Sequence, residues 1–182
     1  MSTSSVANEI RRLDEGLRPD EACGGIGTVS LVGLCEVDPQ LVACRVREVL
    51  RVVLVIQSKP WPTETEWRLL LPDWFVATSS TEMTQDEAEQ WLKKWRTMTV
   101  EQRAALDAIQ RWSLADWLHW VQPSERQWEF WECVASNEHA VRLVIKIDAW
   151  PIAHAALDWL LRAAGANRVV VEESQNSGSR WK

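Results

Sequence analysis

The sequence predicts an α+β protein in which helices pack on one face of a mainly antiparallel sheet. The chain has 182 residues, 46% of them hydrophobic and 25% charged, which is enough for one substantial core with an ordinary globular balance. Helical and strand-like periodicities occur in separate blocks, and a polar turn over 136–139 joins two strand-like segments, as in a hairpin. For the main unit we expect the order strand, three helices, hairpin, helix, strand.

Aromatic residues divide the chain at residue 60. All thirteen tryptophans follow this position, and the first sixty residues contain no aromatic side chain. The segment Lys59-Pro-Trp-Pro62 cannot lie inside a regular element, because its prolines remove backbone donors. We therefore expect an aromatic-free N-terminal extension over 1–60, a tryptophan-rich domain over 61–173 and a flexible tail over 174–182. Whether the extension folds with the main domain stays open.

The N-terminal extension begins with a helical stripe. Its apolar residues recur with helical spacing at Val6, Ile10, Leu13 and Leu17. Gly16 marks the expected end of this helix. Over residues 28–37, apolar and other side chains alternate in a pattern that weakly indicates a strand. Residues 41–56 combine helical spacing with a β-branched run over 52–56, and we expect a helix that passes into a strand.

The tryptophan-rich domain begins with residues 67–77, which are typical of an edge strand because Pro72 interrupts them. Three helices are expected next. The first follows Thr84, with acidic residues at its start and basic residues at its end, as the helix dipole favours. The second begins at a capping box on Thr99, and the third follows Ser113. We assign four tryptophans on their apolar stripes to the core: Trp91, Trp95, Trp112 and Trp117.

The segments 128–134 and 141–148 are expected to pair as a hairpin. In the register that best separates apolar from polar faces, Val134 faces Val141. This register leaves Glu132 on the apolar side of the sheet. The last two expected elements are a helix that ends at Ala164 with Gly165 as its left-handed cap, and a strand over 168–173.

Charge and motif content argue against several classes of protein. The formal net charge of −6 disfavours binding to phosphate backbones, so we expect no nucleic-acid partner. No apolar run approaches the roughly twenty residues of a membrane span. The N-terminus shows no apolar signal segment, and we expect a cytoplasmic protein of bacterial type with no membrane contact. The four cysteines form no CxxC pair and the glycines no nucleotide-binding loop, so no metal, disulfide framework or cofactor is expected.

Four tryptophans are candidates for a binding surface, because each lies beside a proline, on the expected edge strand, or off a core stripe. They are Trp61, Trp74, Trp120 and Trp131. Asp116 and His119 share the outer side of the third helix with Trp120. This spacing could bring a carboxylate, a base and an aromatic ring around one small cleft, but a solvated helix face explains it equally and is the interpretation we favour.

Glu132 is the sharpest anomaly. A carboxylate on an apolar face needs a cationic partner or undergoes a pKa shift, and such groups concentrate at functional sites. A bulge that turns it outward, or an ion pair with an arginine of a neighbouring helix, explains it without a site. On the last helix, His154, Asp158 and Arg162 recur every four residues. We favour an Asp–Arg ion pair on a solvated face over a metal site.

These patterns favour a binding protein over an enzyme, since no motif identifies a reaction. Acidic charge and surplus indoles suit recognition of another protein, in the manner of an immunity protein or antitoxin that neutralises a basic enzyme. Two alternatives stay open. One is a small-molecule or sugar-binding domain with tryptophan platforms, and the other is a small enzyme that uses Glu132, or Asp116 with His119. A homodimer also stays open.

Overall fold

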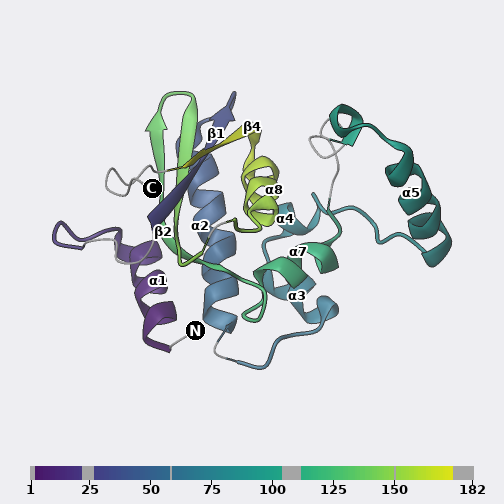
Figure 1. Ribbon diagram of the computed structural model, residues 1–182. Helices are drawn as coiled ribbons and strands as arrows, with labels where there is room; N and C mark the ends of the chain where they lie inside the picture. The colour runs from purple at the N-terminus through teal and green to yellow at the C-terminus, as the bar shows by residue number, and fades with distance from the viewer. Residues whose placement is uncertain (1–2, 22–26, 58, 104–111, 150, 174–182) are drawn as a thin grey trace, which may run out of the picture.

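The computed structural model describes residues 3–21, 27–57, 59–103, 112–149 and 151–173. Four strands form one antiparallel sheet in the spatial order β2-β3-β1-β4 (Figure 1). The predicted α+β class and its antiparallel sheet are therefore confirmed. The strands are β1 (Gly27–Cys35), β2 (Trp128–Asn137), β3 (Ala140–Ile147) and β4 (Ala166–Glu173).

Two helices provide the connections between parallel-running strands. Helix α2 (Pro39–Ile56) follows β1, and α8 (Ala155–Ala164) connects β3 to β4. With this strand order, the sequence β-α-β-β-α-β is the ferredoxin-like, or split β-α-β, topology. The chain between α2 and β2 is an insertion whose described helices are α3 (Glu64–Leu70), α4 (Asp73–Val76), α5 (Gln85–Thr97) and α7 (Leu114–Val121). Among the helices of the described residues, none has the length and apolar character that crossing a bilayer requires.

Helices α2 and α8 cover one face of the sheet (Figure 1). The strand residues alternate accordingly: Leu31 and Cys35 of β1 are buried toward the helices, whereas Leu34 is exposed on the other face. An antiparallel sheet commonly keeps one face open in this way. The predicted packing of helices on one face is confirmed.

The described residues before position 60 share one core with the described residues after it. Strand β1 pairs with both β3 and β4 and so lies inside the sheet. One apolar cluster extends from Leu13 to Ala166. The amino-acid composition therefore changes at residue 60, but the hydrophobic core is continuous across this position. The tail predicted over 174–182 lies outside the described residues.

The expected change from helix to strand within residues 41–56 is wrong. Pro39 occupies the first turn of α2, where a missing N–H costs nothing, and the helix continues to Ile56. The β-branched run stays helical because Val53 and Leu54 are buried in the core. Tertiary packing thus outweighs a weak local preference for strand.

The expected edge strand over 67–77 is also wrong, because α3 and α4 occupy this region. Thr63 and Glu66 form a reciprocal capping box that starts α3. Trp67 and Phe75 are fully buried, so these short helices are anchored by large aromatic side chains. The T-x-x-E pattern at Thr63 and Glu66 indicated a helix start. The strand-like pattern over 67–77 was given more weight in the sequence analysis.

Strands β2 and β3 form the predicted hairpin, with a bulge that changes its register. The pairing up to Phe130 is as predicted. Trp131 is then an extra residue, and beyond it Val134 faces Arg142 instead of Val141. An extra residue exchanges the two faces for the later side chains of a strand.

Helix α1 (Thr3–Glu15) covers the outer edge of β2 and ends, as predicted, at Gly16, whose φ is 83°. The Glu9 carboxylate accepts a hydrogen bond from the backbone N–H of Phe130 (2.5 Å), and Arg12 Nε donates to the carbonyl of the same residue (3.1 Å). Side chains of α1 therefore satisfy both backbone groups at this point of the edge strand. An edge covered in this way does not accept another strand.

Glu9 and Arg126 form an ion pair whose side chains have 0% exposed surface. Arg126 donates to both carboxylate oxygens, at 2.6 and 2.9 Å, and to Gln57 Oε1 at 2.8 Å. Its guanidinium also lies over the ring of Trp128 at 5.0 Å. This network, which joins α1, the end of α2 and the start of β2, was not predicted from the sequence.

A second charged contact holds the turn after α1 and predicts a pH effect. Glu21 accepts hydrogen bonds from Arg12 (2.8 Å) and Arg11, and these bonds, that from Arg12 first, lower its pKa from 4.5 to about 2. Because the folded pKa lies below the unfolded one, the charged form stabilises the fold above about pH 4.5, and this stabilisation is lost as the pH falls toward 2. We expect Glu21→Gln to reduce stability at neutral pH and to flatten the pH dependence in that window. Urea unfolding at a series of pH values measures the stability at neutral pH and its dependence on pH. If the variant lost stability between pH 4.5 and 2 as steeply as the unmodified chain, the expectation would be contradicted.

Candidate functional site

Helix α5 stands apart from the sheet and its covering helices (Figure 1). None of its residues is buried, so the assignment of Trp91 and Trp95 to the core is wrong. Their rings stack on each other instead, with centroids 5.2 Å apart and an interplanar angle of 17°, and Arg103 lies over Trp95 at 5.1 Å. Trp117 is fully buried as predicted, and Trp112 is partly buried against the core.

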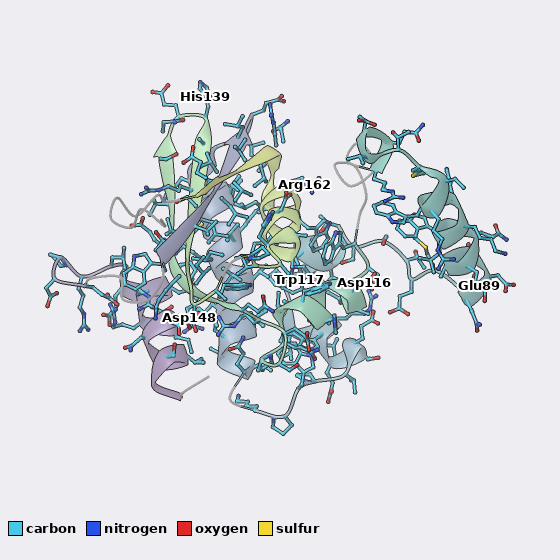
Figure 2. All side chains as sticks on the ribbon, viewed as in Figure 1. Glu89, Asp116, Trp117, His139, Asp148 and Arg162 are labelled. Atoms are coloured by element: carbon cyan, nitrogen blue, oxygen red, sulfur yellow. The ribbon has the colours of Figure 1, made fainter. Side chains whose placement is uncertain are left out.

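A cleft of about 470 Å³ lies between α5, the start of α7 and residues 81–83. Figure 2 shows Asp116 on the side of α7 that is turned toward α5, whereas Glu89 lies on the outer side of α5. The volume suits a long side chain or a small molecule. The apolar part of the lining consists of Met83, Ala88, Trp91, Leu92 and Ala115. Its polar part includes Ser80, Glu82, Ser113 and Asp116.

The chain segments at the base of the cleft are joined to each other. Ser80 and Ser113 form an isolated parallel bridge, and the Ser80 N–H donates to the carbonyl of Trp112 (2.9 Å). Thr84 begins α5 through a capping box with Glu87, and Ser113 caps α7, so both predicted helix starts are confirmed. This junction places the first turns of the two helices on either side of the cleft.

The cap of α7 also fixes the carboxylate of Asp116. Ser113 Oγ donates to Asp116 Oδ2 (2.7 Å), and the N–H of Asp116 donates back to the same Oγ (3.1 Å). These two hydrogen bonds hold the carboxylate of Asp116 in a fixed position at the cleft wall. A ligand therefore meets a carboxylate whose position is already set.

Neighbouring carboxyl groups give the cleft an excess of negative charge. A hydrogen bond to Glu64 is the largest of the causes that raise the pKa of Glu82, and the charges of Glu64 and Asp116 add to it. Arg68 acts in the opposite direction, but its guanidinium is bound to Glu64 at 2.5 Å. A further cation near these carboxyl groups would reduce the repulsion between their negative charges.

The described residues hold no cluster of metal ligands, and the thiol of Cys133 is not activated. Within those ranges, no three His, Cys, Asp or Glu side chains are grouped so that they could hold a metal ion. Burial raises the pKa of Cys133 to about 12, so its thiol stays protonated near neutral pH and is a poor nucleophile. The cleft can act through charge and apolar contact.

The ion pair predicted on the last helix is present. Arg162 Nε lies 2.6 Å from Asp158 Oδ1, one turn apart on α8. Both side chains are about three-quarters covered, so the pair is not on a fully solvated face as expected. Burial raises the pKa of Asp158, against the opposing effect of Arg162.

Of the three residues predicted on the outer side of α7, the cleft is lined by Asp116 and by neither of the others. His119 and Trp120 are exposed, and their rings contact each other edge to face with centroids 5.3 Å apart. Gln122 Nε2 lies 3.2 Å from His119 Nδ1. This cleft therefore brings together the carboxylate of that group with neither the base nor the aromatic ring.

The other three candidate tryptophans are partly buried, each against a different element. Trp61 packs on the buried tryptophan of α3, with centroids 4.8 Å apart. Trp74 donates from Nε1 to Glu48 of α2 (3.1 Å). Trp131 lies under the guanidinium of Arg12 at 4.6 Å. Among the described ring contacts, none joins two of these indoles, and we assign each to holding two elements together.

Glu132 pairs with Arg142 across the hairpin, at 3.2 Å. The bulge at Trp131 turns Glu132 away from the apolar face, and a quarter of its side chain (25%) is exposed. The premise of a carboxylate on the apolar face is therefore wrong. The alternative explanation by a bulge is confirmed, with the arginine supplied by a neighbouring strand rather than by a helix.

Glu82, Trp91 and Leu92 line the cleft but were not predicted as binding residues. Helical spacing does not distinguish a face that packs on a core from one that lines a cleft. The available signal was the narrowness of the apolar stripe in a helix that is otherwise polar. Comparison of the chain with family models, with curated proteins and with solved structures gives no match, and function is therefore inferred from the cleft itself.

Proposed function

We propose that this chain binds another protein and that the cleft takes a basic side chain of that partner, an arginine or a lysine. The observation that carries the proposal is the placement of two carboxyl groups, Glu82 and Asp116, in one cleft with the indole of Trp91. A long cationic side chain combines an apolar stem with a charged head. The cleft offers apolar contact for the stem, carboxylates for the head, and an aromatic ring that attracts cations.

The overall charge supports a basic partner. The chain carries a formal net charge of −6, and an acidic surface steers a positively charged protein toward it. The contact between Glu64 and Glu82 adds a local reason, because a bound cation relieves their repulsion. We therefore propose an acidic binding partner for a basic protein, in the manner of an immunity protein or antitoxin.

The two alternative functions have less support in the structure. A sugar would stack on Trp91, but a neutral ligand leaves the crowded carboxyl groups unrelieved. Acid–base catalysis by Asp116 with His119 requires both groups at one substrate, and His119 is not part of the cleft lining. Glu132 is occupied by its ion pair with Arg142.

Titration with a basic peptide tests the proposal. The probe is an acetylated and amidated peptide of alternating glycine and arginine. Its control is the same peptide with citrulline in place of arginine, which keeps the shape and removes the charge. Calorimetry should show binding of the arginine peptide and roughly tenfold weaker binding of the citrulline peptide. Equal binding of the two peptides would exclude recognition of the charge.

Two variants locate the binding in the cleft. Asp116→Asn should weaken binding of the arginine peptide roughly tenfold, because it removes one charge-assisted hydrogen bond without changing shape. Glu89→Gln removes the same charge from the outer side of α5 (Figure 2), and the peptide should bind it as it binds the unmodified chain. Equal weakening by the two variants would indicate attraction to the whole acidic surface and would contradict a specific cleft.

A further inference from the structure

The two edges of the sheet differ. At one edge, side chains of α1 bond to the backbone of β2. At the other edge, β4 pairs with β1 on one side, and in the described part of the chain no strand pairs on its other side. The outward N–H and C=O groups of such a strand are available to a further strand. The side chains of β4 indicate which strand would pair with this edge.

Pairing with β1 decides which side chains of β4 lie on each face. Val169 and Val171 lie on the side of the helices and pack against the core. The alternate residues lie on the open face: Arg168, Val170 and Glu172. Val170 is 38% exposed and faces Val32 of β1. The edge thus presents an apolar residue between a cation and an anion.

We propose that β4 pairs antiparallel with β4 of a second copy of this chain, so that the two four-stranded sheets become one continuous sheet. The two-fold axis passes through Val170, which faces Val170 of the second copy. Because the strands run in opposite directions, Arg168 faces Glu172 of the second copy, and the symmetry repeats this ion pair on the other side. On the helix side, Val169 faces Val171 of the second copy.

Two properties favour this register over registers shifted by one or two residues. They are the pairing of opposite charges and the alternation of side chains between the two faces of the sheet. A slip of two residues would place Arg168 opposite Val170 and lose the two ion pairs. A slip of one residue would place Arg168 opposite Val171, from the helix-covered face, against the alternation of the sheet. Charged residues on an edge strand usually prevent pairing with unrelated strands. Here the same charges are complementary to a second copy.

Charge exchange at the edge tests the proposal by sedimentation equilibrium of the full chain. The unmodified protein should dimerise reversibly. Arg168→Glu and Glu172→Arg should each weaken the dimer roughly tenfold or more, because each places like charges opposite one another twice. The double variant R168E/E172R should restore dimerisation, since the pairs re-form with reversed sign. A chain that stays monomeric up to roughly 100 μM, or single variants that dimerise normally, would overturn the proposal.

A disulfide measures the register directly. Residues directly opposite in an antiparallel pair have Cα atoms about 4.5–5.5 Å apart, within the range of a disulfide. Val170→Cys should form a symmetric disulfide between copies under mild oxidation, identified by the mass of the linked peptide. Val169→Cys faces Val171 of the second copy and should not form one. Linkage through residue 169 in preference to residue 170 would contradict the axis, and circular dichroism confirms that each variant is folded.

Discussion

Replacing Arg126 with methionine should lower the free energy of unfolding by about 3–5 kcal/mol. The substitution leaves the carboxylate of Glu9 without its bidentate partner, in a place where both side chains have 0% exposed surface. It also removes the donor to Gln57 Oε1. A buried charge that loses its partner must remain desolvated or take up a proton, and both are costly. Urea unfolding followed by circular dichroism measures the loss.

Two further variants show whether burial is the cause. The pair Glu9→Met with Arg126→Met removes both charges and should destabilise less than the sum of the single changes, although the N–H of Phe130 loses its acceptor. Arg51→Met is the matched control, because Arg51 also connects α2 to α1, through Asp14 at 2.8 Å, but these side chains are 54% and 42% exposed. Its urea midpoint should stay close to that of the unmodified chain. Equal midpoints for Arg126→Met and Arg51→Met would show that the buried pair does not anchor α1.

Trp117→Ala should cost a similar amount, about 3–5 kcal/mol. The indole is fully buried between α4, α7 and α8, with its centroid 4.6 Å from that of Phe75 and 6.2 Å from that of Trp159. Its Nε1 donates to the carbonyl of Ala156 (3.0 Å). The substitution therefore leaves a cavity and removes the indole hydrogen bond to this carbonyl. Within the described ranges, Trp117 makes one of two aromatic contacts by which the insertion packs on α8, the other being that of Phe75 with Trp159.

Trp120→Ala on the same helix is the control for this prediction. Trp120 lies three residues further along α7, is 38% exposed and contacts the ring of His119. Its replacement should change the free energy of unfolding by less than about 1 kcal/mol. Urea unfolding of the two variants, followed by circular dichroism, compares them directly. Similar losses would mean that the aromatic cluster around Trp117 does not anchor the helix.

The elements that could be predicted from the sequence depend on interactions between near neighbours. The caps at Thr84 and Ser113 act within one helical turn, and their helices were found where expected. The hairpin followed from a polar turn between two apolar segments. The region 67–77 shows the limit of this reasoning, because a capping box and an apparent alternation competed there and the capping box prevailed.

What could not be predicted depends on contacts between distant residues or on one extra residue. Glu9 and Arg126 lie 117 positions apart, and neither has a local pattern that indicates burial. The bulge at Trp131 adds one residue without a glycine or proline to mark it. Of the candidate site, Asp116 was predicted because it lies off a core stripe. Trp91 was assigned to the core because its spacing equals that of a buried residue.

The bridge between Ser80 and Ser113 affects which changes in length and sequence the fold tolerates. The bridge holds these two serines side by side, so the segment between them has adjacent ends. Its length can vary at small entropic cost, because closing a longer loop between fixed ends costs little more than closing a shorter one. Helix α5 contributes no buried side chain. Substitutions in α5 should therefore leave the stability of the ferredoxin-like scaffold nearly unchanged.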